Sequence, residues 1–361
     1  MQRASQRGVH SPRRSLNHRL AHWCVGSAAL AIGLLAAPGV ARADPAGPTD
    51  YRSEVVSITP TTDVISVSIE GGDSFVRIVV AEGHELTVLG YDDEPYLRIS
   101  ADGTVEENRR SAATYYNTER FGTDTLPEVV DNDAPPDWVA VGRGGSWAWH
   151  DHRAHWMGPE PPIGLDAGES LPPQVVPVVV DGVRVDIAVQ ITLQSSPSVW
   201  PAVFGVLTGL LVVLLAGRAG PATLTFGTLV LATTATVVGV AQFRSLPAET
   251  GPLMTWWLLP AIAVACAVAT IVTYGRWPTM QSAVALLAGL QLALWAYTRR
   301  ATLTKPVLPT DLPFWFDRII TAAALAGGTA LTVVAGVALF RPPPQPLRGD
   351  ADTVDDDEPI R

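Results

Sequence analysis

The sequence predicts an all-β domain followed by an all-α transmembrane bundle of about five helices. The domain is expected to be an antiparallel β-sandwich, immunoglobulin-like or cupredoxin-like. Two observations carry this prediction. Short β-branched or alternating runs, separated by Gly- and Asp-containing turns, fill residues 44–197. From residue 199 onward the chain is apolar, with only short polar breaks.

The first 43 residues have the pattern of a secretory signal peptide. Five arginines and no acidic residue precede a short apolar run, Val25–Val40, and Ala41-Arg42-Ala43 fits an A-x-A cleavage site. Cleavage there leaves a mature chain that begins at Asp44. We therefore expect residues 44–197 to form an extracytoplasmic domain on a multi-pass protein of the plasma membrane.

Six to eight short strands are expected in this domain. They are predicted over residues 55–58, 64–69, 75–80, 85–89, 96–100, 104–106, 175–180 and 183–193. Asp102-Gly103 and Asp181-Gly182 are typical of tight hairpin turns. Residues 108–136 are polar and irregular, which predicts a long connection that is either functional or disordered.

The charge of the expected domain excludes one class of partner. Residues 44–197 contain 26 acidic residues and nine arginines, a net charge of −17. Nucleic acid is therefore excluded, because binding to phosphates needs the opposite sign. A solvated cell-envelope surface, with membrane lipid and an envelope or membrane protein as partners, fits this composition.

Five membrane spans are expected in residues 199–340. They are placed at 199–217, 221–243, 254–274, 279–298 and 319–340, each near the ~20 residues that a helix needs to cross a bilayer. No charged residue lies inside these ranges, which disfavours a proton pump or an ion path. Gly328, Thr332 and Gly336 form a small-residue face for close helix packing. Five spans after an exported domain place the acidic tail, 341–361, in the cytoplasm, where we expect disorder.

The most unusual stretch is residues 147–157, Trp-Ala-Trp-His-Asp-His-Arg-Ala-His-Trp-Met. It holds three of the seven histidines, three of the eleven tryptophans and one of the four methionines. In an extended chain, His150 and His152 would share one face, with Asp151 and Arg153 on the other.

We interpret this stretch first as a transition-metal site, with copper as the first choice. Imidazoles ligate copper, zinc and nickel, and a thioether adds preference for Cu(I). The candidate ligands are His150, His152, His155 and Met157, with His84 as a more distant candidate. Asp151 could fix a histidine tautomer, Trp149 and Trp156 could shield the ion, and Arg153 must pair with Asp151 or point away.

Two alternatives use the same residues without a metal. Trp and His both need hydrogen-bond partners when buried, so the stretch could be a folding cluster. It could also be a protein–protein contact, in which Trp, Arg and Met are enriched. We do not expect an enzyme. No Ser or Cys is placed as an activated nucleophile, and a phosphohydrolase-type centre around His150-Asp151 would have only His84 as a distant ligand.

Three stretches together resemble a known family. They are Glu94-Pro-Tyr-Leu-Arg98, Glu107-Asn-Arg-Arg-Ser111 and Trp149-His-Asp-His-Arg153 with His155-Trp-Met157. They resemble a family of actinobacterial membrane proteins that join a signal peptide and an exported domain to a helical bundle. The resemblance implies this layout for most of the mature chain and transfers no activity. The layout is also loosely similar to copper-resistance membrane proteins, from which it departs by lacking histidines in the spans.

Overall fold

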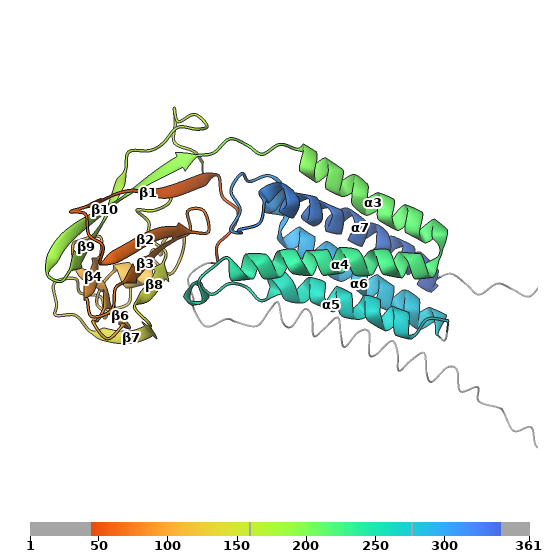
Figure 1. Cartoon of the computed structure of the whole chain (residues 1–361), viewed down its shortest axis with the longest axis horizontal. Coiled ribbons are helices and arrows are strands. Elements are labelled where there is room, and N and C mark those ends of the chain that lie inside the picture. The colour runs from red at the N-terminus through yellow and green to blue at the C-terminus, as the bar shows by residue number, and fades with distance from the viewer. Residues whose placement is uncertain (1–44, 159, 276, 341–361) are drawn as a thin grey trace, which may run out of the picture.

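The computed structural model describes residues 45–158, 160–275 and 277–340 (Figure 1). The predicted signal peptide, 1–43, and the predicted cytoplasmic tail, 341–361, lie outside the described residues. A β-rich domain packs against one end of a helical bundle. The predicted fold class, an antiparallel β domain followed by five apolar helices, is confirmed.

Ten strands form two antiparallel sheets. The seven-stranded sheet has the order β1-β10-β9-β4-β5-β6-β7, and the three-stranded sheet has the order β2-β3-β8. The strands are β1 (Tyr51–Thr59), β2 (Ile65–Glu70), β3 (Phe75–Val80), β4 (Leu86–Leu89), β5 (Pro95–Ile99), β6 (Thr104–Asn108), β7 (Trp138–Arg143), β8 (Ser146–Trp149), β9 (Gln174–Val180) and β10 (Val183–Leu193).

The main core lies between the two sheets. Val76 and Ile78 of the small sheet are fully buried against Leu97, Val178 and Ile187 of the large sheet. Each such side chain stabilises the fold by ~1.5–3 kcal/mol relative to an exposed one. The domain is thus a sandwich, while its finer likeness to immunoglobulin or cupredoxin domains stays a prediction.

The strands β7 and β8 were not predicted from the sequence, and the long connection 108–136 is ordered. β7 is the end strand of its sheet and buries no side chain fully, so its sequence lacks the alternation that marks a half-buried strand.

In the connection 108–136, a short helix, α2 (Ala113–Tyr116), is followed by Asn117, which accepts a hydrogen bond from the Tyr91 hydroxyl. This connection packs back on the domain near the end of β8.

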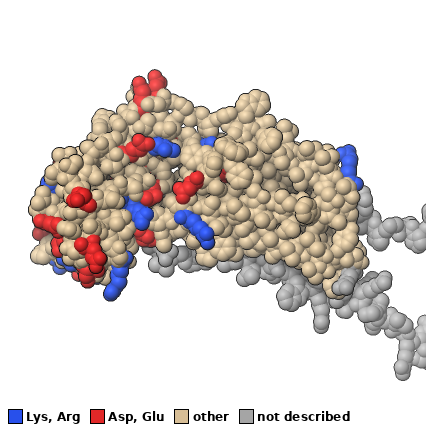
Figure 2. Space-filling model, in the orientation of Figure 1, with Lys and Arg blue, Asp and Glu red and all other residues tan. Residues whose placement is uncertain are grey.

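The second half of the chain is a bundle of five helices, each long and apolar enough to cross a membrane. They are α3 (Trp200–Ala219), α4 (Pro221–Arg244), α5 (Thr255–Val272), α6 (Pro278–Thr298) and α7 (Phe314–Phe340). Charged side chains gather on the β domain and at its junction with the bundle, whereas the visible side of the bundle is almost bare of them (Figure 2). The chain is therefore a multi-pass membrane protein.

The predicted start of the last helix is wrong. α7 begins at Phe314 rather than at 319, which brings Asp317 and Arg318 into its first turns, and both side chains are buried. Arg299, at the end of α6, donates to both carboxylate oxygens of Asp317 at 2.8 and 2.7 Å. Asp317 can be buried here because it is paired and because a helix N-terminus favours an acidic group. Arg318 instead donates to the backbone carbonyls of residues 302, 305 and 306. Both residues lie in the first turns of α7, so the interior of this span contains no ionisable residue, as expected.

The β domain is joined to the bundle by direct contacts in addition to the chain connection. Thr49 and Val307 exchange two backbone hydrogen bonds, of 3.0 and 3.1 Å. Phe75 and Ala148 of the small sheet pack against Leu246 and Trp256 at the near end of the bundle. Both polar and apolar contacts thus fix the orientation of the domain.

The predicted small-residue face packs α7 against α6. A Cβ atom on Gly328 would lie 2.7 Å from the Ala293 nitrogen, and one on Gly289 would lie 2.6 Å from the Thr332 hydroxyl. Only glycine allows this approach, as expected for helices that associate through small residues.

We expect Gly289→Ala to lower the melting temperature of the detergent-purified protein, because overpacking costs ~1–3 kcal/mol. Gly217→Ala is the matched control, since a Cβ there meets nothing within 4 Å. This control should leave the melting temperature unchanged or raise it, because alanine favours helix. Equal effects of the two substitutions would contradict close packing of α6 on α7.

Candidate functional site

The histidine-rich stretch starts as a strand and then turns. β8 pairs with β3 up to Trp149, which lies opposite Val76. The chain then leaves the sheet, and the Ala154 amide bonds the Asp151 carbonyl at 2.8 Å to close a turn. Residues 150–153 were expected to alternate as in a strand, but they form a turn. The turn still places the side chains of His150 and His152 apart from those of Asp151 and Arg153.

Three of the candidate histidines gather on one side of this turn. The His155 ring lies 5.4 Å from the His152 ring and 6.0 Å from the His150 ring, measured between centroids, and both pairs meet edge to face. His150 and His155 are buried and His152 is half-buried. We call these three residues the histidine cluster.

The acid and base of the motif form a buried ion pair. Arg153 donates from Nε and Nη2 to the two carboxylate oxygens of Asp151, each at 2.8 Å, and Trp149 donates to the same carboxylate at 3.1 Å. Burial alone would raise the pKa of Asp151, but the Arg153 guanidinium outweighs it and holds the pKa below its usual value. Arg153 also donates to the carbonyls of Leu89 and Gly90, so the turn is tied to the β4–β5 connection.

Two of the three imidazoles form a hydrogen bond from one ring nitrogen to a backbone carbonyl. His155 Nδ1 lies 3.3 Å from the Trp156 oxygen, and His152 Nε2 lies 3.1 Å from the Glu119 oxygen. A carbonyl only accepts, so each of these nitrogens carries a hydrogen, and in a neutral ring the other nitrogen then presents a lone pair. Nε2 of His155 is buried and has no hydrogen-bond partner within the described ranges.

His155 is held in its neutral form. Burial lowers its pKa from the usual 6.5 to about 3, and the nearby positive charge of Arg120 acts in the same direction. A neutral imidazole needs to lose no proton before it accepts a metal ion.

The aromatic neighbours of the cluster differ from those expected. The Phe75 ring lies 4.4 Å from the His150 ring, and the Tyr91 ring stacks on His152 at 5.8 Å. Trp149 is instead buried in the main core of the sandwich. Trp156 packs on Tyr51, Ile191 and Leu193, and its indole donates to the Glu160 carbonyl. The rings that flank the histidines are therefore Phe75 and Tyr91.

The two remaining ligand candidates are placed differently. His84 lies in the turn after β3, beyond the end of that strand opposite to Phe75, and its Nδ1 contacts the Asp181 carboxylate at 2.6 Å. Met157 is half-buried and follows the turn directly. The structure thus brings together His150, His152 and His155 and leaves His84 apart.

Several residues of the site carried no signal of their own in the sequence. Tyr91 both stacks on His152 and accepts a hydrogen bond from its backbone amide at 3.0 Å. Arg120 pairs with the fully buried Asp73. A residue that contributes through a contact with a residue far away in the sequence cannot be recognised from its own local sequence pattern. The quoted stretches 94–98 and 107–111 do converge, since the Ser111 hydroxyl donates to Glu94 at 2.6 Å.

In this structure the side chains of the histidine cluster are not arranged around a single metal position. Across the described residues, no group of three or more His, Cys, Asp or Glu side chains is arranged to hold a metal ion. Two imidazoles that ligate one ion at ~2.1 Å have ring centroids roughly 5 Å apart. The separations of 5.4 and 6.0 Å both exceed this distance.

Comparisons with known proteins give no relative. No family model, no curated protein and no solved structure matches the chain.

We expect Arg153→Leu to destabilise the protein by about 3–5 kcal/mol, because it leaves the Asp151 carboxylate buried and unpaired. Arg184→Leu is the matched control. It also removes an arginine from two ion pairs, with Asp93 and Asp186, but all three groups are exposed, so the effect should be small. Thermal melting of the detergent-purified variants measures both, and similar losses would contradict a structural role for the buried pair.

Stability should also depend on pH through Glu107. Burial raises its pKa to about 7, so the native state prefers the protonated acid. The stabilisation is complete below the unfolded-state pKa near 4.5 and is lost as pH rises through 7. Glu107→Gln, which stays neutral, should therefore gain in melting temperature over the native protein between roughly pH 5 and roughly pH 8. A difference that is constant over this range would contradict the shift.

Proposed function

We propose that this multi-pass membrane protein carries its β domain on the outer face of the plasma membrane and binds a transition metal there, copper first. His150, His152 and His155 are the proposed ligands. The role is capture or hand-off of the ion and involves no catalysis. An acidic, solvated domain suits the outer face, where cations are attracted to it.

The observation that carries the proposal is the His155 imidazole. It is neutral, one nitrogen is oriented by the Trp156 carbonyl, and the other is buried without a partner among the described residues beside two further imidazoles. Metal-ligating histidines commonly donate their second nitrogen to a carbonyl in this way, which fixes the tautomer and raises the basicity of the ligating atom. An unused buried acceptor is costly in the empty state, and a bound ion would remove that cost.

Copper is favoured on ligand grounds. Imidazole nitrogens suit copper, zinc and nickel, and copper heads the affinity order for divalent first-row metals. Met157, directly after the turn, could add a thioether when the site closes, which would favour Cu(I). Asp151 is engaged by Arg153 and Trp149, so it serves the turn rather than the ion.

A second candidate function has its own observation. The Asp151–Arg153 pair and its bonds to Leu89 and Gly90 would serve equally well if the stretch is a folding element or the base of a partner-binding surface in the envelope. In that case the histidines fill space beside Phe75 and Tyr91, and metal ions have no specific effect.

Calorimetric titration of the detergent-purified full chain with copper, zinc and nickel tests the proposal. We expect one ion per chain, bound most tightly for copper, and affinity reduced by at least about tenfold in His152→Ala and His155→Ala. His84→Ala is the matched control and should bind as the native protein does. Bound copper should also raise the melting temperature, because a ligand of the native state stabilises it.

Two outcomes would contradict the metal proposal. One is a well-folded protein that binds none of the three ions. The other is equal loss of affinity in the His84, His152 and His155 variants, which would indicate non-specific binding to surface imidazoles.

A further inference from the structure

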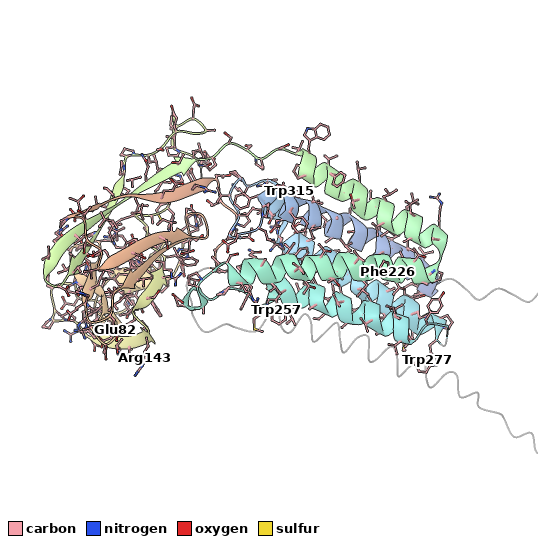
Figure 3. All side chains as sticks on the ribbon, viewed as in Figure 1. Glu82, Arg143, Phe226, Trp257, Trp277 and Trp315 are labelled. Atoms are coloured by element: carbon pink, nitrogen blue, oxygen red, sulfur yellow. The ribbon has the colours of Figure 1, made fainter. Side chains whose placement is uncertain are left out.

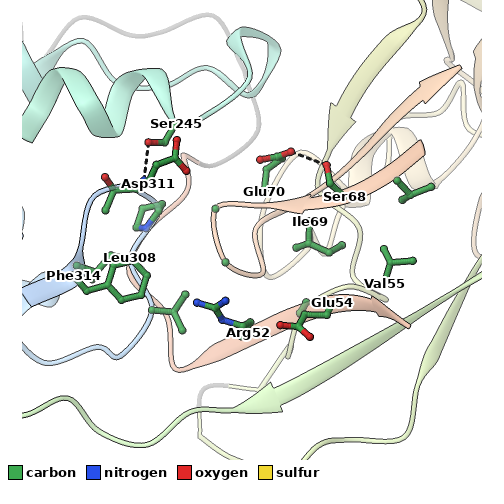
Figure 4. Close-up of a pocket in the computed structure, with 17 residues that line it drawn as sticks. Arg52, Glu54, Val55, Ser68, Ile69, Glu70, Ser245, Leu308, Asp311 and Phe314 are labelled. Carbon is green, nitrogen blue, oxygen red and sulfur yellow. Dashed lines mark hydrogen bonds between the residues drawn. The ribbon is translucent and has the colours of Figure 1, made fainter. Parts of the chain in front are cut away.

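A second candidate site lies where the two sheets part beside the bundle. A cleft of about 390 Å³ opens there between β1, the end strand of the large sheet, and β2, the end strand of the small one (Figure 4). Residues 307–314, which lead into α7, form its third side. None of the three histidines lines this cleft, so it is separate from the proposed metal site.

The cleft presents both signs of charge. Arg52 and Glu54 stand two residues apart on β1, which places their side chains on one side of the strand. Glu70 enters from β2 and Asp311 from the loop before α7, next to Ser245 (Figure 4). The cleft thus combines one guanidinium with three carboxylates.

These charges are largely free to meet a ligand. Arg52, Glu54 and Asp311 form no ion pair with any other residue in the described ranges. Glu70 accepts from the Ser68 hydroxyl at 2.7 Å and lies 4.0 Å from Arg77. A ligand with an anionic and a cationic group could therefore satisfy groups that are otherwise left to water.

The same cleft has apolar walls. Val55 and Ile69, which are half-buried at the edge of the main core, line the cleft from the two strands, and Leu308 and Phe314 line it from the side of the bundle (Figure 4). A ligand that fits must carry an apolar portion next to its charged groups.

The position of the cleft relative to the membrane indicates where such a ligand comes from. Phe314 is the first residue of α7, and the next residue, Trp315, has 56% of its surface exposed. Trp315 and Trp257 lie at the end of the bundle next to the β domain, and Trp277 lies at the opposite end (Figure 3). Tryptophans are enriched at both membrane–water interfaces. This arrangement fits a cleft at the level of the lipid headgroups.

We propose that this cleft binds a phospholipid whose headgroup carries a phosphate and a primary ammonium. Arg52 would hold the phosphate, for which a guanidinium is well suited. Glu54, two residues away on the same side of β1, would accept hydrogen bonds from the ammonium, which has three donors. Leu308 and Phe314 would contact the glycerol and the first methylenes of the acyl chains. This inference does not depend on the proposed metal site.

The test uses the delipidated full chain in detergent and dihexanoyl phosphatidylethanolamine as the probe. Phosphatidylglycerol and phosphatidylcholine of the same chain length are the comparison lipids. We expect phosphatidylethanolamine to bind at least about tenfold more tightly than either, since one lacks the ammonium and the other cannot donate hydrogen bonds from it.

Matched variants assign the binding to the cleft. Arg52→Gln and Glu54→Gln should each weaken phosphatidylethanolamine binding by about tenfold. Arg184→Gln, at an exposed position of β10 outside the cleft, should leave it unchanged. Equal melting temperatures of the three variants show that any loss is not a loss of folding.

Three outcomes would overturn the proposal. They are equal affinity for the three lipids, unchanged binding in Arg52→Gln, and binding of free phosphoethanolamine as tight as that of the lipid. The last would mean that a soluble molecule, rather than the membrane, supplies the ligand. None of them bears on copper binding, so failure of the two proposals can be told apart.

Discussion

The arrangement of the β domain around its histidines depends on the Asp151–Arg153 ion pair. Burying two charges is costly, and the attraction between them offsets this cost only when hydrogen bonds satisfy the remaining atoms. Here Trp149 and the carbonyls of Leu89 and Gly90 supply those bonds. The pair therefore has one favourable geometry, which directs Asp151 and Arg153 to one side of the turn and leaves the neighbouring imidazoles to the other.

A comparable constraint fixes the domain on the bundle. Val307 forms backbone bonds with Thr49, and Lys305 pairs with Asp50. Gly72, at the β2–β3 turn, has φ of +86°, and a Cβ there would lie 2.5 Å from Val307. A glycine is needed at this position both for its backbone conformation and for the close approach of the turn to the loop. The domain and the bundle therefore form one structural unit, because hydrogen bonds, an ion pair and a close glycine contact at their junction fix their relative orientation.

Much of this fold could be predicted from periodicity, because β3, β9 and β10 alternate or run continuously apolar and the five helices are long apolar segments. Where burial does not follow a local pattern, prediction fails. β7 buries no residue fully, and the start of α7 is obscured because Asp317 and Arg318 are polar in the sequence but paired or hydrogen-bonded in the structure. For the site, the gathering of His150, His152 and His155 could be predicted from their spacing. The contributions of Tyr91, Phe75 and Arg120 could not, because each arises from a contact between distant parts of the chain.

The β2–β3 hairpin physically connects the two proposed sites. Ile69 to Gly72 line the cleft at the bundle. The chain then passes directly into Asp73, which pairs with Arg120, and Phe75, whose ring lies against the His150 ring. Phe75 also packs against Leu246 and Trp256 of the bundle. A group that displaced this hairpin at the cleft would move the ring that supports His150, and by linkage an ion at the histidines would influence the cleft to the same degree. Such coupling requires two discrete arrangements of the hairpin, and the buried Asp73–Arg120 pair, which must break or move as a unit, is the contact that would separate them.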